Sequence, residues 1–498
     1  MSGLTILKNL SRYKQTAIID SEGEYSYPDL LDASHRVASY LLKDREDLDE
    51  AGVSFFVPPG FEYVAVMLGI WRAGGIAVPL SVSHPDPELE YVVKDSGAEL
   101  LLAAPQFNDR LGKLAEKTGT DFSTVEEAVQ CKKISLPLVS EDRRAMIIYT
   151  SGTTSTPKGV VSTHASIRAQ IASLVKAWEW TSGDFILNVL PLHHLHGIIN
   201  ALFCALWSGA SCELMPGFDA GRVWGKFTDG SYTLFMAVPT IYSRLIRVWQ
   251  NAPPEKREEM SGACGRMRLM VSGSAALPVS TLEKWKEISG HVLLERYGMT
   301  ETGMALSNPL HGERMPGHVC KPLPGVEVKL IDENETVIRG AGEGEIIIKG
   351  PNVFFEYWRK PDATKEAFIN GEWFRTGDIA RRNKDGVYRI MGRSSVDIIK
   401  SGGYKVSALE VEEVLREHPQ IEECAVVGVE DEEWGERVCA ALVLGGKKKI
   451  NLASLRKWSK ERMASYKVPS AILFVDELPH NQMGKVVKPE VAALFNSQ

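Results

Sequence analysis

The feature that most constrains the fold is a series of short, uninterrupted apolar runs, each ending in small or polar residues. Eight such runs, with helical stretches between them, are "VSFFVPPG", "IAVPLS", "ELLLAA", "AMIIYTSG", "FILNVLPL", "LFMAVPT", "RLMVSGSA" and "HVLLERYG". Strands that are apolar throughout are buried on both faces, and strands that alternate with helices form parallel sheets. The sequence therefore predicts an α/β fold with ligands at the carboxyl ends of the strands.

The pattern changes after about residue 320. There "GVEVKLIDENETVIRGAGEGEIIIKG" alternates apolar and polar residues, as short antiparallel strands do. Farther on, Ser407 and Glu410 form a capping-box pattern that opens an amphipathic helix, followed by two apolar strands and the helical stretch "NLASLRKWSKERM". We expect an N-terminal domain at 1–393 that includes a small β-barrel-like part, and a mobile α+β domain at 394–498 with its hinge at "RSS".

Length and charge set further limits. A chain of 498 residues exceeds what one hydrophobic core usually supports, which predicts at least two domains. The 57 basic and 64 acidic residues give a net charge of −7, which argues against nucleic acid or an anionic membrane as the main partner. No apolar run approaches the roughly 20 residues that a membrane helix requires. The oligomeric state is not predicted.

Cysteine usage and the N-terminus bear on the compartment. The seven cysteines are scattered without a C-x-x-C pair, which predicts a reducing, intracellular compartment and neither zinc nor disulfides. The first residues lack a secretory signal pattern. Leu4, Leu7 and Leu10 at helical spacing predict a short packed helix, while the lack of acids before Asp20 also fits organellar targeting. The cytoplasm is expected, with an organelle matrix as the alternative.

A segment rich in hydroxyl groups and glycine, "IIYTSGTTSTPKGVV", includes the end of one predicted strand. Hydroxyls and free backbone N–H groups suit phosphate oxygens, and Lys158 adds a positive charge. The segment is not the usual P-loop, because Lys158 is followed by Gly159 rather than by serine or threonine. A flexible Ser/Thr-rich loop is the alternative, but it does not explain why Pro-Lys-Gly stands directly before another apolar run.

Four more segments follow in order: "ERYGMTETG", "WFRTGD" (373–378), "GRSSVDIIKSGGYKVSALEVE" (392–412) and "NQMGKV" (481–486). Together with the phosphate segment they resemble the motifs of the adenylate-forming superfamily of acyl-CoA synthetases, luciferases and peptide-synthetase adenylation domains. The resemblance extends over nearly the whole chain. Within the superfamily, "LLERYGMTETGMALSNPL" and the segment at 392–412 are most similar to malonyl-CoA synthetases.

The resemblance implies a two-step ligation of a carboxylic acid to coenzyme A. The carboxylate attacks the α-phosphorus of ATP, releasing pyrophosphate and forming an acyl-AMP; the CoA thiol then attacks the acyl carbon and AMP leaves. The first step brings two anions together, so it requires cations and dipoles at the reacting phosphate. The implied small-molecule partners are malonate, ATP with Mg²⁺, and CoA. Methylmalonate, a short or aromatic monocarboxylate, or a catalytically weakened nucleotide-binding relative are the alternatives.

The resemblance also assigns residues to the nucleotide, the metal and the thiol. Around the phosphates it implies Thr150, Ser151, Gly152, Thr153, Thr154, Ser155, Thr156, Pro157 and Lys158. Around the adenosine it implies Ser274, Ala275, Ala276, Tyr297, Gly298, Met299, Asp378 and Arg393. Thr300 would contact the α-phosphate, and Glu301 with Thr150 would hold Mg²⁺. Gly402 and Gly403 would approach the pantetheine of CoA, since glycine permits close backbone contact.

The catalytic lysine implied by the resemblance is Lys485, in "NQMGKV" near the C-terminus. Out of context it would be a solvated surface lysine. In this motif, it would bridge the carboxylate and the α-phosphate during adenylation and then withdraw as the small domain rotates. His194, in "PLHHLHG", would stand beside the reacting carboxylate, with His196 and Ser272 in the acyl pocket. A histidine metal site or a purely structural role are the alternatives for these histidines.

Arg296, between the apolar "HVLL" and the polar "YGMTETG", is the predicted substrate-specificity residue. Malonate has two carboxylates and adenylation consumes one, so the other would be buried as an anion and would require a cation. A guanidinium suits this because its planar fork holds a carboxylate by two hydrogen bonds. An ion pair with Glu295 or another acid is the alternative.

Two residues depart from the pattern of the superfamily. Ser155 and Cys320, the latter in "GHVCKPLPG", stand where relatives usually have glycine. If either position requires a positive φ, the side chain stores strain of about 1–2 kcal/mol. The sequence leaves open whether either residue weakens the enzyme.

Overall fold

Two large sheets form the centre of the computed structural model, which describes residues 3–150, 157–445, 450–481 and 485–496. The first sheet has the strand order β15-β14-β13-β12-β11-β9-β10-β1-β2, and the second has β18-β8-β7-β4-β3-β5-β6. From β13 through β1 in the first sheet, and from β7 to β6 in the second, neighbouring strands are parallel. Each of the eight apolar runs contains one of these strands, which confirms the α/β prediction.

The strands of the first sheet are β1 (Thr16–Ile19), β2 (Glu24–Ser26), β9 (Phe185–Asn188), β10 (Ser211–Leu214), β11 (Leu234–Ala237), β12 (Leu269–Ser272), β13 (Leu294–Met299), β14 (Gly303–Ser307) and β15 (Lys321–Pro322). Those of the second are β3 (Gly52–Phe56), β4 (Ile76–Pro79), β5 (Leu100–Ala103), β6 (Asp121–Thr124), β7 (Arg144–Thr150), β8 (Lys158–Thr163) and β18 (Glu356–Tyr357).

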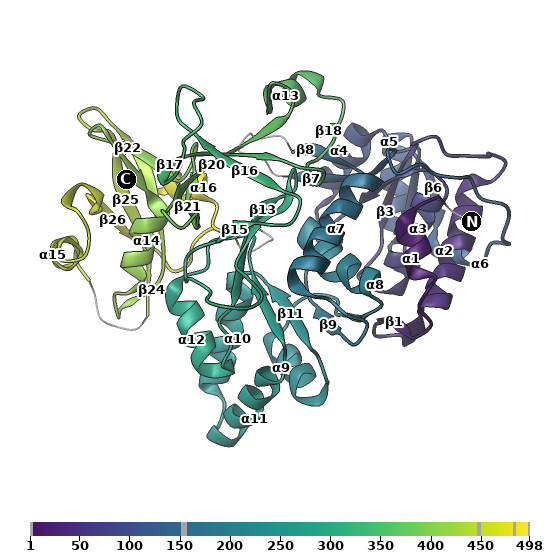
Figure 1. Cartoon of the computed structure of the whole chain (residues 1–498), viewed down its shortest axis with the longest axis horizontal. Helices are drawn as coiled ribbons and strands as arrows, with labels where there is room; N and C mark the ends of the chain where they lie inside the picture. Colours follow the sequence, from purple (N-terminus) through teal and green to yellow (C-terminus); the bar gives the residue numbers. More distant parts are fainter. Residues whose placement is uncertain (1–2, 151–156, 446–449, 482–484, 497–498) are drawn as a thin grey trace.

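Helices pack around these sheets (Figure 1). They are α1 (Thr5–Leu10), α2 (Tyr27–Leu42), α3 (Phe61–Arg72), α4 (Asp86–Ser96), the 3₁₀-helix η1 (Pro105–Phe107), α5 (Asn108–Thr118), α6 (Val125–Gln130), α7 (His164–Trp178), the π-helix η2 (His196–Phe203), α8 (Cys204–Ser208), α9 (Ala220–Asp229), α10 (Pro239–Asn251), α11 (Pro254–Gly265), α12 (Val279–Ser289) and α13 (Pro361–Glu366).

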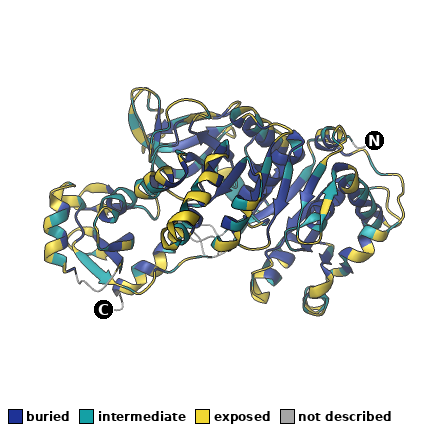
Figure 2. Cartoon of the chain, turned by 90° about the horizontal axis from the view of Figure 1, so that it is seen from below, coloured by how far each residue is buried: buried dark blue, intermediate teal, exposed yellow. Residues whose placement is uncertain are grey.

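Helix α3 shows why the two sheets share one core. Its residues from Tyr63 to Trp71 are all buried, as expected for a helix that is apolar on every face. They belong to the same cluster as Ile186 of β9 and Met146 of β7. Helices α4 and α5 pack against β3, β4, β5, β7 and β8 in a second cluster, so the second sheet is covered on both faces. In Figure 2 the central strands are mostly dark blue, and the outer helices carry much of the yellow.

The antiparallel region predicted after residue 320 forms a third sheet with the order β16-β17-β20-β19, and β21 pairs with β20. Its strands are β16 (Glu327–Ile331), β17 (Gly342–Lys349), β19 (Phe368–Ile369), β20 (Trp373–Arg382) and β21 (Tyr388–Arg393). This sheet lies between the N-terminal sheets and the C-terminal part of the chain (Figure 1).

The C-terminal part has its own sheet, with the order β23-β22-β25-β24 and β26 beside β25. Its elements are β22 (Ile398–Ser401), β23 (Tyr404–Ser407), α14 (Ala408–Arg416), β24 (Ile421–Asp431), β25 (Gly435–Leu444), α15 (Leu452–Lys460), the 3₁₀-helix η3 (Ser465–Lys467), β26 (Ala471–Phe474) and α16 (Lys488–Asn496). Two hydrophobic clusters lie within this part, in agreement with the predicted α+β unit.

Only half of the predicted capping box forms. The Ser407 hydroxyl accepts a hydrogen bond from the backbone N–H of Glu410 at 3.2 Å, so Ser407 caps α14 as expected. The carboxylate of Glu410 instead pairs with Lys467 at 2.7 Å, because an ammonium is a stronger partner than a backbone N–H. Leu4, Leu7 and Leu10 are buried at α1, which confirms the packed N-terminal helix.

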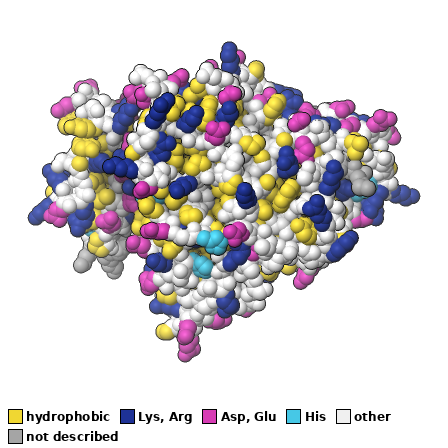
Figure 3. All heavy atoms as spheres, in the orientation of Figure 1, with side chains coloured by type: hydrophobic (Ala, Val, Ile, Leu, Met, Phe, Trp, Pro, Cys, Tyr) yellow, Lys and Arg dark blue, Asp and Glu magenta, His cyan; other side chains and the backbone are white. Residues whose placement is uncertain are grey.

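All seven cysteines are free. No helix in the described ranges combines the length and the apolar character that crossing a membrane requires. The face drawn in Figure 3 carries basic and acidic side chains interspersed over its surface. This distribution agrees with the nearly balanced charge of the sequence.

Cys320 has a positive φ of 53°, as its place in the sequence suggested. Its thiol is buried and donates a hydrogen bond to the Asn308 side chain at 3.0 Å. Cys320→Ala and Cys320→Gly both remove this bond, but only alanine keeps the Cβ that strains the backbone. We expect Cys320→Gly to be more stable than Cys320→Ala by about 0.5–1 kcal/mol, since relief of about 1–2 kcal/mol exceeds the entropic cost of glycine. Urea denaturation measures the difference, and equal stabilities would show that the backbone there is unstrained.

Candidate active site

Arg296 is a buried cation that has no anionic partner among the described residues. It lies on β13 with 4% of its surface exposed, and its Nη2 donates a hydrogen bond to the Ser274 hydroxyl at 3.2 Å. Its Nε and Nη1 have no hydrogen-bond partner, and no carboxylate of the described residues lies within ion-pair distance. Burial lowers the pKa of Arg296 to about 9, so it stays charged at neutral pH. An unpaired buried charge is costly, which indicates that an anion binds there.

Glu295 is not the partner of Arg296. Successive side chains of a strand point to opposite faces, so the two neighbours on β13 diverge. The Glu295 carboxylate accepts a hydrogen bond from the backbone N–H of Gly317 at 2.8 Å. Burial raises the pKa of Glu295 to about 8, as expected for a carboxyl group without a paired cation. The alternative of a Glu295–Arg296 ion pair is therefore wrong.

A chain of hydrogen bonds extends from Arg296 to His196. The Ser274 hydroxyl accepts from Arg296, which leaves its proton free to donate to Nδ1 of His196 at 3.2 Å. Burial lowers the pKa of His196 well below its ordinary value, so the ring is neutral. With Nδ1 accepting from Ser274, the ring proton is assigned to Nε2. That Nε2 and the buried Ser272 hydroxyl have no hydrogen-bond partner among the described residues. The free groups of Arg296, His196 and Ser272 can all donate hydrogen bonds, which suits an anion.

Backbone conformation holds this cluster together. A Cβ atom on Gly273 would lie 2.5 Å from Cζ of Arg296, so only glycine lets the guanidinium pack over the end of β12. Ser274 follows with a positive φ of 68°, and its hydroxyl contacts both Arg296 and His196. The next residues, Ala275 and Ala276, are exposed, as an adenine-packing surface requires.

Lys485 comes to this cluster from the other end of the chain. It is partly buried, and its backbone N–H donates to the Asn481 side chain at 3.0 Å. Burial, followed by the charges of Arg296 and Arg393, lowers the pKa of Lys485 to about 8. Burial, followed by the charge of Lys485, lowers the pKa of His194 to about 4. The structure therefore brings the predicted lysine, histidine and arginine to one place.

The predicted ribose and adenine residues also meet. The Asp378 carboxylate accepts hydrogen bonds from the Tyr297 hydroxyl at 2.5 Å and from Nε of Arg393 at 2.9 Å. Asp378 and Arg393 are paired across β20 and β21, and Tyr297 lies on β13 directly after Arg296. These contacts place the predicted nucleotide-binding residues next to Arg296 on the chain.

The ends of the phosphate segment meet Glu301 through Tyr357. Thr150 and Lys158 are paired at the ends of β7 and β8, and the Lys158 ammonium lies 5.0 Å from the Tyr357 ring centroid. The Tyr357 hydroxyl donates to the buried Glu301 carboxylate at 2.9 Å. Sequence reasoning missed Tyr357, because no motif marks its position.

Glu301 can act as a ligand of a metal ion that is held mainly by the nucleotide. Burial raises its pKa, and within the described ranges its carboxylate has no ion-pair partner. The same ranges contain no group of three or more His, Cys, Asp or Glu that could hold a metal. Mg²⁺ at ATP takes most of its ligands from phosphate and water and requires only one or two carboxylates. Glu301 fits this requirement, with Thr150 at the end of β7.

The remaining predicted residues lie as follows. Six predicted residues of the phosphate segment lie outside the described residues: Ser151, Gly152, Thr153, Thr154, Ser155 and Thr156. The strain expected at Ser155 therefore stays a prediction. Pro157 accepts a hydrogen bond from the Tyr91 hydroxyl at 2.7 Å. Gly298 and Met299 end β13, and Thr300 lies in the turn to β14. Gly402 and Gly403, with φ of 56° and 81°, form the turn between β22 and β23 beside Trp434.

Comparison with protein families agrees with this geometry. The family model described as "AMP-binding enzyme" matches residues 9–358, and that of its C-terminal domain matches residues 410–485. The chain belongs to the AMP-binding enzyme family. A mitochondrial relative in this family, malonate–CoA ligase ACSF3 of Mus musculus, is 46% identical over 95% of this chain and 88% of its own length. The predicted enzyme class and superfamily are thereby confirmed.

Solved structures of the AMP-binding family show the same fold. ATP-bound MatB from Rhodopseudomonas palustris superimposes with a TM-score of 0.91 at 32% identity, over 99% of both chains. The apo form of the same protein, at equal coverage and identity, gives a TM-score of 0.82. The overall arrangement of this chain is therefore more similar to the ATP-bound form than to the apo form.

Sequence reasoning also missed Asn200, on η2. It is fully buried, and both polar atoms of its side chain lack a hydrogen-bond partner among the described residues. The available signal was an amide in the otherwise apolar run "GIINALF".

Proposed function

We propose that this protein is a malonate–CoA ligase that converts malonate, ATP and CoA to malonyl-CoA, AMP and diphosphate through malonyl-AMP. Membership of the AMP-binding enzyme family accounts for ATP with Mg²⁺ and for CoA as the co-substrate. The similarity to a malonate–CoA ligase supports the choice of acid.

The observation that carries the proposal is the unpaired guanidinium of Arg296. Adenylation consumes one carboxylate of malonate and leaves the other as an anion inside the site. Nε and Nη1 of Arg296 have no partner among the described residues, and Nη2 keeps a second N–H, so one edge of the guanidinium can hold the two oxygens of such a carboxylate. A monocarboxylate would bury an alkyl or aromatic group against this charge, which is unfavourable. The same geometry also accommodates methylmalonate, whose additional methyl group leaves both carboxylates in place.

In the adenylation step, one oxygen of the reacting carboxylate bonds to the α-phosphorus, and the bond from that phosphorus to the bridging oxygen of diphosphate breaks. Lys485 offsets the charge that gathers between the two anions, with Thr300 at the α-phosphate. His194, kept neutral by burial, borders the reacting carboxylate without adding charge. Lys158 and the phosphate segment hold the departing diphosphate. Glu301 and Thr150 would hold Mg²⁺, which would supply positive charge at the phosphates.

The second step requires a different arrangement of the chain. We place the domain boundary between residues 393 and 394, with Ser394 and Ser395 as the hinge. The position of Lys485 beside Arg296, together with the greater likeness to ATP-bound MatB, supports adenylation as the described state. Rotation about the hinge would withdraw Lys485 and bring Gly402 and Gly403 to the pantetheine, where the thiolate attacks the acyl carbon and AMP leaves.

The seven free cysteines support a reducing compartment, either the cytoplasm or an organelle matrix. The partners in this proposal are small molecules, and nucleic acid is not among them.

Pyrophosphate release tests the function. Protein mixed with MgATP should release pyrophosphate with malonate, to a smaller extent with methylmalonate, and far less with butyrate. Release with butyrate equal to that with malonate would overturn the choice of acid. Nucleotide binding without pyrophosphate release for any acid would identify a weakened nucleotide-binding relative.

The adenylation half-reaction should slow as pH rises through about 8. Lys485 is charged below its pKa of about 8 and loses its proton above it, so its stabilisation of the reacting phosphate is lost at high pH. Thioester formation from preformed malonyl-AMP should respond in the opposite direction, because a thiol of pKa about 8.5 ionises there. The measurement is kcat/KM for each half-reaction from pH 6 to 9.5.

Glu295 provides the control for this profile, because its pKa of about 8 lies in the same range. Glu295→Gln should keep the decline of adenylation at high pH. A profile that becomes flat in this variant would assign the decline to Glu295 instead of Lys485.

A further inference from the structure

The π-helix η2 contains one side chain that its surroundings do not satisfy. Asn200 has 0% of its surface exposed, and neither Nδ2 nor Oδ1 has a hydrogen-bond partner within the described residues. Roughly 90% or more of buried polar groups in proteins are hydrogen-bonded, because burying them without a partner is unfavourable. An orphaned amide at this depth therefore indicates a polar group that the protein binds.

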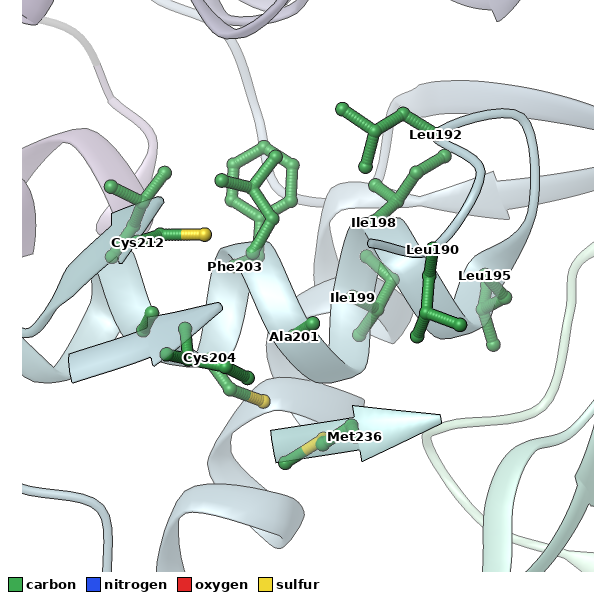
Figure 4. Packing of buried hydrophobic residues seen from close by; sticks show 14 of the residues in the cluster. Leu190, Leu192, Leu195, Ile198, Ile199, Ala201, Phe203, Cys204, Cys212 and Met236 are labelled. Carbon is green, nitrogen blue, oxygen red and sulfur yellow. The ribbon is translucent and has the colours of Figure 1, made fainter. Parts of the chain in front are cut away.

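Hydrophobic packing accounts for the burial of the apolar residues of η2. Ile198, Ile199, Ala201 and Phe203 belong to the main hydrophobic cluster, together with Leu190, Leu192, Leu195 and Met236 from neighbouring segments (Figure 4). An apolar side chain at position 200 would suit these surroundings as well or better. Packing consequently gives no reason for an amide there.

The position of Asn200 on the helix connects it to the active site. It follows His196 by four residues, which places both side chains on the same face about one turn apart. His196 contacts Ser274 at 3.2 Å, and Ser274 receives the hydrogen bond of Arg296 at 3.2 Å. The face of η2 that carries Asn200 is therefore the face that borders the Arg296 cluster.

We propose that Asn200 is a specificity-determining residue whose Nδ2–H donates a hydrogen bond to the second carboxylate of the dicarboxylic acid. This inference rests on the proposed function. A carboxylate has about four acceptor sites, and two hydrogen bonds from one edge of the Arg296 guanidinium leave acceptor sites for Asn200. A monocarboxylate lacks this group and would leave the amide unpaired, so Asn200 adds to the discrimination made by Arg296.

Asn200→Leu tests the proposal, because leucine has a similar size and no polar atoms. The Tm of the free protein should stay the same or rise, since an unsatisfied amide is removed from an apolar environment. The kcat/KM for malonate should fall by about tenfold to a hundredfold, as on loss of a hydrogen bond to a charged group. The KM for ATP should be unchanged, and the activity with butyrate should stay the same or increase.

Asn200→Asp is a second variant, in which a carboxyl group of the same shape replaces the amide. It should lose more activity with malonate than with butyrate, because a carboxylate beside the second carboxylate repels it. Equal losses with the two acids would contradict the proposed contact.

Asn188 is the matched control, since it is also buried but has its hydrogen bonds within the protein. Its Nδ2 donates to the Gly197 carbonyl at 3.1 Å, and its Oδ1 accepts from the Leu190 N–H at 3.0 Å. Asn188→Leu should lower the Tm and reduce activity with every acid alike. If Asn200→Leu behaves in the same way, Asn200 is structural and the proposal is wrong.

Retention of the full malonate preference by a well-folded Asn200→Leu protein would also overturn this inference, while leaving the malonate assignment in place. Failure of the wild-type protein to release pyrophosphate with malonate would overturn the proposed function and this inference with it.

Discussion

Lys485→Ala should lose the adenylation half-reaction while still forming malonyl-CoA from preformed malonyl-AMP. Lys485 lies close enough to Arg296 and Arg393 for their charges to lower its pKa, and this is where the carboxylate and the α-phosphate would meet. Two anions react there, and the ammonium offsets the charge that they concentrate. Removing one such group from a preorganised site costs on the order of a hundred- to a thousandfold in rate. Pyrophosphate release measures the first half-reaction, and thioester formation from malonyl-AMP measures the second.

The contrast between the two half-reactions is the informative result. In the proposed second step, Lys485 has withdrawn with the small domain, so its loss should not affect attack by the thiolate. Lys457→Ala is the control, because Lys457 is an exposed lysine on α15 in the same part of the chain. It should leave both half-reactions unchanged. Equal loss of both half-reactions in Lys485→Ala would contradict the two-conformation mechanism.

Arg296→Ala should convert a dicarboxylate enzyme into one that no longer prefers malonate. The guanidinium is buried with two free nitrogen atoms, so its removal leaves the second carboxylate of malonate buried and unpaired. Activity with malonate should fall by on the order of a hundredfold or more, from the loss of a buried charge pair of about 3–5 kcal/mol. Activity with butyrate should be unchanged or improved, because the charge that disfavours alkyl groups is gone. The measurement is kcat/KM for each acid.

Stability should respond differently from activity in this variant. Because Arg296 has no anionic partner in the part of the chain that the structure describes, its removal should leave the Tm unchanged or raise it. Arg268 is the matched control, since it is paired with the buried Asp184 at 2.6 Å. Arg268→Ala should lower the Tm and affect all acids alike. A well-folded Arg296→Ala protein that keeps the full preference for malonate would overturn the choice of substrate.

Local sequence patterns were sufficient to predict much of the fold. The apolar runs at β3, β4 and β5 predicted buried parallel strands, since a strand covered on both faces has no reason to alternate. The change to alternation predicted the antiparallel pair β16 and β17. The prediction that the Glu410 side chain completes the capping box was wrong. Its actual partner, Lys467, is 57 residues away along the chain, so a local pattern could not reveal it.

The sequence by itself determined the chemistry that the chain carries. The resemblance of the motifs pointed to Lys485, Arg296 and Glu301, and their residue types suit carboxylate and phosphate, because charge and hydrogen-bonding capacity belong to the residue type. The glycine-like position of Cys320 was also visible in the sequence, and its positive φ confirms the backbone requirement.

Only the tertiary structure decided which of these groups are satisfied within the protein and which remain free for a ligand. The sequence left open whether Arg296 pairs with Glu295. In the structure the Glu295 carboxylate accepts from the Gly317 N–H, and two nitrogens of Arg296 have no partner among the described residues. The link through Tyr357 and the orphaned amide of Asn200 were likewise decided in three dimensions. The physical reason is that burial and hydrogen-bond satisfaction depend on segments far apart in the chain, whereas charge and propensity are local.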